Sequence, residues 1–150
     1  MNQICQEAQE LCNSFFQSAG LSIEASLNKD SVSCAINFDG EDASLLRNEG
    51  GEMLDAVEHL INKIYAPQME RSERILCDVQ GFRQTRETEL RFMAQHAAEQ
   101  IRKTRVPFKF APMNANERRI LHLALAESED LTTESVGEGT NRHLVIRLKD

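Results

Sequence analysis

An arginine and a histidine four residues apart are the side chains of this chain best suited to hold an anion. Arg118 and His122 lie in the segment Asn114-Ala-Asn-Glu-Arg-Arg-Ile-Leu-His122, which is typical of a helix. Residues four apart share one helical face, so a guanidinium and an imidazole would lie on one small surface. Both groups donate hydrogen bonds and the guanidinium is always charged, which suits a phosphate. The pair predicts a nucleic-acid contact. Spacing alone leaves open a surface arginine beside a histidine packed at a sheet edge.

The periodicity of this helix, residues 116–127, predicts which side chains face the core. The two expected faces are Ile120, Leu121 and Ala124 on one side, and Arg118, His122 and Leu125 on another. Arg118 and His122 are therefore expected to lie away from the core. Arg119 is rotated from Arg118 by about 100° and would contact a second phosphate or only solvent.

Further cations flank the pair. Lys109 is expected on a short strand before the helix, and Arg142 and Arg147 on or beside the last strand. A basic surface there would follow the backbone of a single strand, whereas the alternative for each cation is a solvated surface charge. The predicted nucleic-acid-binding set is Arg118, His122, Arg119, Arg142 and Lys109.

Charge is unevenly distributed along the 150 residues, whose net charge is −7. Residues 1–80 carry 5 Lys and Arg against 14 Asp and Glu, and residues 81–150 carry 12 against 10. The acidic first half argues against broad charge-driven binding and predicts modest affinity through a local patch. With few aromatic residues, recognition should rest on phosphate and shape, with weak sequence preference.

Hydrophobic periodicity predicts an α/β (α+β) chain of two small units, each with helices packed on a three-stranded sheet. The first, residues 1–80, has the order helix, strand, strand, short helix, loop, helix, strand, which is the order of a type II KH domain. The second, residues 81–150, begins with a long helix from about residue 82 to 103. It continues with a strand at 108–110, the helix at 116–127, and strands at 132–136 and 144–148. Asn114 or Asn116 is the expected cap of the second helix.

These motifs together resemble a known bacterial family. Residues 112–125, Leu131-Thr-Thr-Glu-Ser-Val-Gly-Glu-Gly139 and Arg142-His-Leu-Val-Ile-Arg-Leu-Lys149 closely resemble the R-3-H (Arg-x3-His) domain of Jag-type proteins. Gly51-Glu-Met-Leu-Asp-Ala-Val57 and Asp78-Val-Gln-Gly-Phe-Arg83 are similar to the KH domain that precedes it there. The resemblance implies non-catalytic binding of single-stranded RNA, or else DNA, and a role in post-transcriptional regulation or as an RNA chaperone. It also implies a protein partner, either another KH-domain protein or a second copy of the chain.

The loop 48–51 departs from that family. KH domains hold about four nucleotides with a G-x-x-G loop, whose glycines let the backbone approach phosphate. Here the loop reads Asn48-Glu49-Gly50-Gly51, so the first glycine is replaced and Glu49 brings negative charge. We therefore expect a scaffold or dimerisation role for the first unit rather than a phosphate grip. A protein-interaction adaptor that has lost nucleic-acid binding is the alternative function.

Other classes find little support in the sequence. There is no G-x-S-x-G, P-loop or H-E-x-x-H motif, so we expect no enzyme, cofactor or metal. Four cysteines, none in a C-x-x-C pair, are expected to be small buried hydrophobic residues in a reducing cytosol. No apolar run of about 18 residues exists, so no membrane span is expected. The first residues, Met-Asn-Gln-Ile-Cys-Gln-Glu, have no basic patch followed by an apolar block, so no signal peptide is expected, and the expected location is cytoplasmic.

Overall fold

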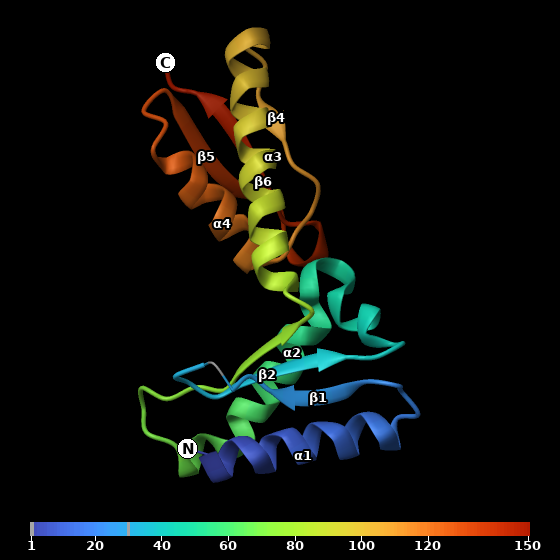
Figure 1. Ribbon diagram of the computed structural model, residues 1–150. Helices are drawn as coiled ribbons and strands as arrows, with labels where there is room; N and C mark the ends of the chain where they lie inside the picture. Colours follow the sequence, from blue (N-terminus) through green and yellow to red (C-terminus); the bar gives the residue numbers. More distant parts are fainter. Residues whose placement is uncertain (1, 30) are drawn as a thin grey trace. The chain divides into compact units, whose positions relative to one another are not determined.

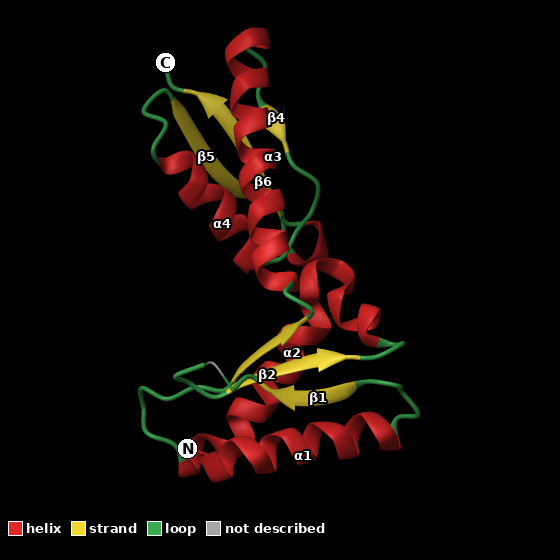
Figure 2. Ribbon diagram, viewed as in Figure 1, coloured by secondary structure: helices red, strands yellow, loops and turns green. Residues whose placement is uncertain are grey.

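The computed structural model describes residues 2–29 and 31–150, and it divides the chain into two compact units. The first unit is Met1–Arg83 and the second is Gln84–Asp150. Each contains helices and a three-stranded sheet, coloured red and yellow in Figure 2, so the chain has the predicted α+β fold. The division falls three residues after the expected domain boundary at residues 80 and 81.

The first unit has the predicted element order (Figure 1). Its helices are α1 (Asn2–Ser18), η1 (Ala43–Arg47), α2 (Asn48–Tyr65) and η2 (Ala66–Gln68), and its strands are β1 (Glu24–Leu27), β2 (Ala35–Asp39) and β3 (Leu76–Val79). The sheet order is β1-β2-β3, with β1 and β2 antiparallel and β2 and β3 parallel. The parallel pair requires the intervening helices to cross over the sheet.

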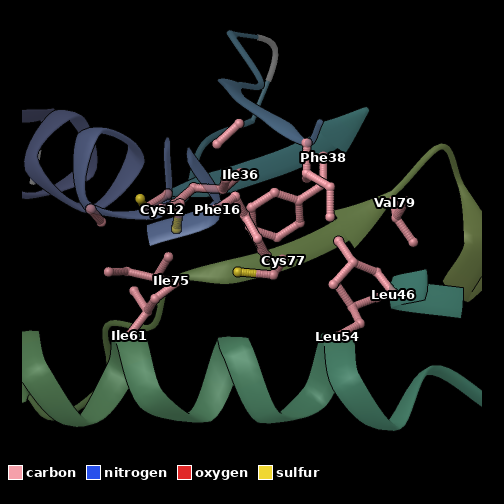
Figure 3. Close-up of a cluster of buried hydrophobic side chains, with 14 of the residues drawn as sticks. Cys12, Phe16, Ile36, Phe38, Leu46, Leu54, Ile61, Ile75, Cys77 and Val79 are labelled. Carbon is pink, nitrogen blue, oxygen red and sulfur yellow. The ribbon is translucent and has the colours of Figure 1, made fainter. Parts of the chain in front are cut away.

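The core of this unit joins α1, α2 and the sheet (Figure 3). Ala8, Cys12 and Phe16 are buried at four-residue spacing along α1, and Ile36 and Phe38 alternate along β2. The rings of Phe16 and Phe38 meet edge to face with centroids 5.5 Å apart. These apolar residues, which the periodicity of α1 and β2 predicted to face the core, are therefore buried there.

Side chains of the two long helices close both edges of this sheet. On β1, the backbone N–H of Ala25 donates to Asn13 Oδ1 (2.7 Å), and the Ala25 carbonyl accepts from Gln9 Nε2 (2.9 Å). Beside β3, Asn62 Oδ1 accepts from the backbone N–H of Ile75 (2.9 Å) and Asn62 Nδ2 donates to the Ile75 carbonyl (2.7 Å). These bonds occupy groups that an edge strand would otherwise offer to another strand.

All four cysteines are buried, as predicted, but two of them are paired. Cys5 and Cys34 form a disulfide with Cα atoms 5.8 Å apart, so the expectation of four separate thiols was wrong. They lie 29 residues apart in sequence, and only the packing of α1 against the segment before β2 brings them together. Cys12 and Cys77 are free, and burial raises the pKa of Cys12 to about 11 and that of Cys77 further.

The second unit contains α3 (Phe82–Thr104, whose first two residues fall in the first unit), β4 (Phe108–Lys109), α4 (Ala115–Ala126), β5 (Leu131–Val136), η3 (Gly139–Asn141) and β6 (His143–Leu148). The strand order is β4-β6-β5, antiparallel throughout, so β5 is an edge strand. Leu90, Ala94 and Ile101 of α3 pack with Leu121 and Leu125 of α4 against Leu144 and Ile146 of β6. Helix α4 is thereby fixed against the sheet.

Candidate nucleic-acid interface

Helix α4 presents the predicted Arg-x3-His pair. The side chain of Asn114 accepts a hydrogen bond from the backbone N–H of Glu117 (2.9 Å), so Asn114 is the cap, one of the two that the sequence predicted. The cap fixes where the helix begins. Arg118, half-buried, and His122, exposed, follow on its second and third turns.

The core face of α4 differs from the prediction. Glu117, Leu121 and Leu125 are the buried residues of the helix, and they form one row at four-residue spacing. The placement of Leu125 beside Arg118 and His122 was therefore wrong. Apolar periodicity does not reveal this row because its first member is a glutamate, which is rarely buried without a partner.

An ion pair explains the buried glutamate. Glu117 is only 4% exposed, and its Oε1 accepts from Arg86 Nε of α3 at 2.7 Å. Burial opposes the charge of the Arg86 guanidinium, but its hydrogen bonds to Glu117 and Glu89 hold its pKa above the ordinary value. Helix α3 thus holds the first turn of α4, one residue before Arg118.

The guanidinium of Arg118 is held in place by the backbone that precedes its helix. Its Nη1 donates to the Met113 carbonyl at 2.6 Å. The Met113 N–H donates in turn to the Arg142 carbonyl at 3.2 Å, and Arg142 Nε donates to Ser135 Oγ at 2.9 Å. Arg118 and Arg142, both in the predicted set, are thus joined through a single residue. Among the described residues, no other hydrogen bond occupies the remaining guanidinium N–H groups, which can therefore donate to an anion.

His122 is oriented by a threonine of the edge strand. Its Nδ1 makes a hydrogen bond with Thr133 Oγ1 of β5. Within the part of the chain that the structure describes, no protein group bonds to its Nε2. Because Thr133 and Ser135 are two apart in a strand, both hydroxyls lie on the side of β5 that faces α4. The site therefore includes two hydroxyl residues, Thr133 and Ser135, that were absent from the predicted set. Their two-residue spacing in Leu131-Thr-Thr-Glu-Ser135 was a signal in the sequence that both lie on one face of the strand.

The remaining predicted cations are divided between two surfaces. Arg119 is exposed, and its side chain makes no hydrogen bond or ion pair among residues 2–29 and 31–150. Lys109 pairs in register with Val145, whereas Thr133 pairs with Ile146. Neighbours in a strand point to opposite faces, so Lys109 and Thr133 lie on opposite faces of the sheet. The structure brings Arg118, His122 and Arg142 together and leaves Lys109 on the far face, together with Arg147.

The backbone of the loop 48–51 takes the left-handed conformation that its two glycines favour. Glu49, Gly50 and Gly51 all have positive φ, at 53°, 69° and 84°, between η1 and the regular part of α2. A Cβ on Gly51 would lie 2.6 Å from the ring of Phe82, so any larger residue would have to displace that ring. Asn48 and Glu49 are exposed, which places the glutamate carboxylate on the loop surface.

Comparison with known proteins identifies the second unit. Residues 88–148 match the R-3-H domain family, and this range contains Arg118, His122, Thr133 and Arg142. A protein of Clostridium symbiosum named RNA-binding protein KhpB is 28% identical over 145 residues, covering 95% of this chain and 65% of that protein. A Bacillus subtilis protein of the same name is 34% identical over 112 residues, covering 73% and 54%. A third, from Lactiplantibacillus plantarum, is 25% identical over 114 residues, covering 76% and 35%.

The family match establishes the class of protein to which the chain belongs. The chain is an R-3-H-domain protein, and its Arg-x3-His pair lies inside the matched range. Its R-3-H match, together with its similarity over most of its length to proteins named RNA-binding protein KhpB, supports the Jag-type resemblance seen in the sequence. The chain spans about two thirds of the Clostridium relative and about half of the Bacillus one.

Two further findings concern the surroundings of the site. Among the described residues, no helix has the length and apolar character needed to cross a bilayer. The same residues include no group of three or more His, Cys, Asp or Glu placed to hold a metal ion.

Proposed function

We propose that this protein binds single-stranded RNA, in preference to DNA, without catalysis, through the surface where α4 meets β5. Arg118 and His122 are the central contacts, and Arg119 and Arg142 extend them. The observation that carries the proposal is the joint orientation of a guanidinium by Met113 and an imidazole by Thr133 on one side of the sheet. The relatives named RNA-binding protein KhpB support RNA as the ligand.

We assign Lys109 a smaller role in RNA binding than the other predicted cations. Because it lies on the other face of the sheet, we assign it long-range attraction of the strand rather than a direct contact. By the same family resemblance, the biological role is post-transcriptional regulation or RNA chaperoning in the cytoplasm.

The central test combines two substitutions with a salt titration. Arg118→Ala together with His122→Ala should weaken binding of a fluorescent single-stranded RNA to all sequences alike, because phosphate contacts carry no sequence information. With about two to four phosphate contacts, the logarithm of the affinity of the unchanged protein should fall with the logarithm of salt at about −0.7 per contact. The double variant should show a shallower slope.

A matched control removes the same side-chain types elsewhere. Arg91→Ala together with His96→Ala deletes an exposed arginine and an exposed histidine of α3 in the same unit. That variant should keep its RNA affinity within about twofold, since surface charges at a distance are largely screened. Equal losses in both variants would mean that net charge alone, and not the proposed site, binds RNA. Single-stranded DNA and duplex RNA are measured alongside.

The loop of the first unit is tested separately. Glu49→Lys replaces an exposed carboxylate with an ammonium. It should raise RNA affinity severalfold if the loop touches RNA, because repulsion becomes attraction. Unchanged affinity, together with loss in the Arg118 and His122 double variant, would assign RNA binding to the second unit alone.

The adaptor alternative retains one supporting observation, the acidic first half with Glu49 exposed on its loop. We propose that the first unit serves pairing, with another KH-domain protein or with a second copy of this chain. An adaptor without RNA affinity would bind such a partner and show no RNA binding even at low salt.

A further inference from the structure

Strand β5 has an open edge beside the candidate site. In the first unit, side chains of α1 and α2 bond to outward backbone groups at both edges of the sheet, so those edges are closed. Strand β5 pairs with β6 on one side, and no strand of the described residues pairs with its other side (Figure 1). Because an edge strand presents unpaired N–H and C=O groups, β5 offers hydrogen bonds to another molecule.

The hydrogen bonds of the sheet determine which residues of β5 point outward. The backbone N–H of Lys149 donates to the Asp130 carbonyl at 2.9 Å, so these two residues form a bonded pair. Bonded and non-bonded pairs alternate along an antiparallel ladder, so every second residue after Asp130 turns its backbone toward β6. Thr133 and Ser135, at the intervening positions, turn their N–H and C=O groups outward. No group in the described part of the chain bonds to the Thr133 carbonyl or the Ser135 N–H.

These two outward residues also orient the side chains of the candidate site. Thr133 Oγ1 bonds to His122 Nδ1, and Ser135 Oγ accepts from Arg142 Nε at 2.9 Å. Their hydroxyls lie on the face toward α4, whereas their backbone groups point past the edge, in the plane of the sheet. Thr133 is half-buried and Ser135 is exposed, so a ligand can reach both. The open edge is therefore continuous with the surface of the Arg-x3-His pair.

The Thr133 carbonyl and the Ser135 N–H are neighbouring groups, one an acceptor and the other a donor. An unpaired nucleobase carries the complementary pair on its Watson–Crick edge. Adenine and cytosine have an amino donor beside a ring-nitrogen acceptor, and guanine and uracil have a ring N–H donor beside a carbonyl acceptor. Every base can therefore make both bonds in one of two orientations, which gives weak sequence preference. In a duplex the same groups are already bonded to the complementary strand.

We propose that the edge of β5 holds the base of a nucleotide whose phosphate lies on Arg118 and His122, and that this contact selects single strands over duplex. The inference rests on the proposed RNA binding and adds to it the groups that recognise the base. A phosphate bonded to His122 Nε2 lies across the imidazole ring from Thr133, so phosphate and base are contacted from one side of the sheet. An extended peptide could also pair with a free edge, but Arg118 and Arg142 beside it favour a polyanion.

A comparison of Ser135→Pro with Ser135→Ala isolates the backbone donor. Both changes remove the hydroxyl that accepts from Arg142, but only proline removes the N–H. Proline is tolerated on an edge strand where the N–H faces solvent. The proline variant should bind a single-stranded RNA about threefold to tenfold more weakly than the alanine variant, the range for one hydrogen bond. Both variants should bind an abasic strand of the same length equally, because their phosphate contacts are the same. Damage to the fold would instead weaken binding of both strands, and circular dichroism checks for it.

Amide NMR of the unchanged protein is a second measurement that needs no variant. Single-stranded RNA should shift the Ser135 amide signal, and the abasic strand should shift it less. The Glu134 amide, which points toward β6, is the internal control. The unchanged protein should also bind the RNA about threefold to tenfold more tightly than the abasic strand. A strand whose bases carry a methyl group on the Watson–Crick edge should bind like the abasic one.

The outcomes separate the base contact from the proposed function. Equal affinity for RNA and abasic strand, or equal affinity of the unchanged protein for duplex and single strand, would overturn the base contact. Loss of both strands in the Arg118 and His122 double variant would still leave the phosphate site in place. If that double variant kept full affinity for both strands, the proposed function itself would fall. A Ser135 amide that is shifted by an extended peptide and not by RNA would overturn RNA as the occupant of the edge.

Discussion

Thr133 decides which nitrogen of His122 faces outward. If its hydroxyl donates to Nδ1, the proton of a neutral ring stands on Nε2, where it can donate to a phosphate oxygen. Thr133→Val removes the hydroxyl with little change of shape. RNA binding should then weaken by about threefold to tenfold, the equivalent of one hydrogen bond of ~0.5–1.5 kcal/mol.

The control for Thr133 is Thr133→Ser, which keeps a hydroxyl and should keep most of the affinity. Nitrogen NMR of the His122 ring reports the tautomer without any RNA. A smaller share of the Nε2–H form in Thr133→Val, with its recovery in Thr133→Ser, supports a positioning role. If the valine variant binds RNA less tightly while the tautomer is unchanged, Thr133 contacts RNA itself.

Single residues differ in how far the sequence could place them. Asn114 as a cap was predictable because a cap is a local interaction within one turn. Leu125 was misplaced because its burial depends on the row begun by Glu117, whose partner Arg86 is 31 residues away. The bond between His122 and Thr133, and the disulfide of Cys5 with Cys34, likewise depend on packing between separate elements. Local patterns carry no signal for such contacts.

At the scale of elements, the turn before α2 depends on one glycine. Gly51 has φ +84°, and an added Cβ would meet the Phe82 ring at 2.6 Å. Gly51→Ala therefore combines backbone strain with overpacking, and it should lower the free energy of unfolding by about 2–4 kcal/mol. Urea unfolding followed by circular dichroism measures the change.

Gly20 provides the matched comparison for that element. Its φ is +73°, but an added Cβ would meet nothing within 4 Å. Gly20→Ala should therefore show the backbone cost alone, about 1–2 kcal/mol. Equal effects of the two substitutions would mean that the Phe82 ring moves aside without cost.

The order of the helices and strands was predictable from the sequence. Which side chains lie on which face of a helix or sheet was only partly predictable. Alternation and four-residue spacing indicated the strands and helices of both units, since burial repeats with the period of the backbone. The register between strands cannot be read from such local periodicity, because it depends on which residues of separate strands pair. Lys109 shortly precedes the Arg-x3-His pair along the chain, and only its pairing with Val145 assigns it to the other face of the sheet.

At the scale of the whole molecule, pairing through the first unit would give each assembly two R-3-H units. Two linked sites on one RNA bind in sequence, the second at a raised effective concentration. An RNA long enough for two sites should thus bind at least about tenfold more tightly than one that fits a single site. Loss of pairing should remove this gain while leaving the affinity for the short RNA unchanged. Fluorescence anisotropy with a series of RNA lengths measures both.

The same experiment separates the two proposals for the intact protein. A length-dependent gain that persists in a monomeric chain would come from contacts within one molecule. Absence of any gain in a proven dimer would mean that the two sites cannot engage one strand together.

The bond from Arg118 to the Met113 carbonyl has a consequence for the thermodynamics of recognition. A free arginine side chain samples many rotamers, and ordering one at an interface costs about 0.5–1.5 kcal/mol. Here folding has already restricted Arg118, and Thr133 has done the same for the His122 ring. Little side-chain entropy then remains to be lost on association. A site with few cations can in this way keep a measurable hold on a flexible polyanion.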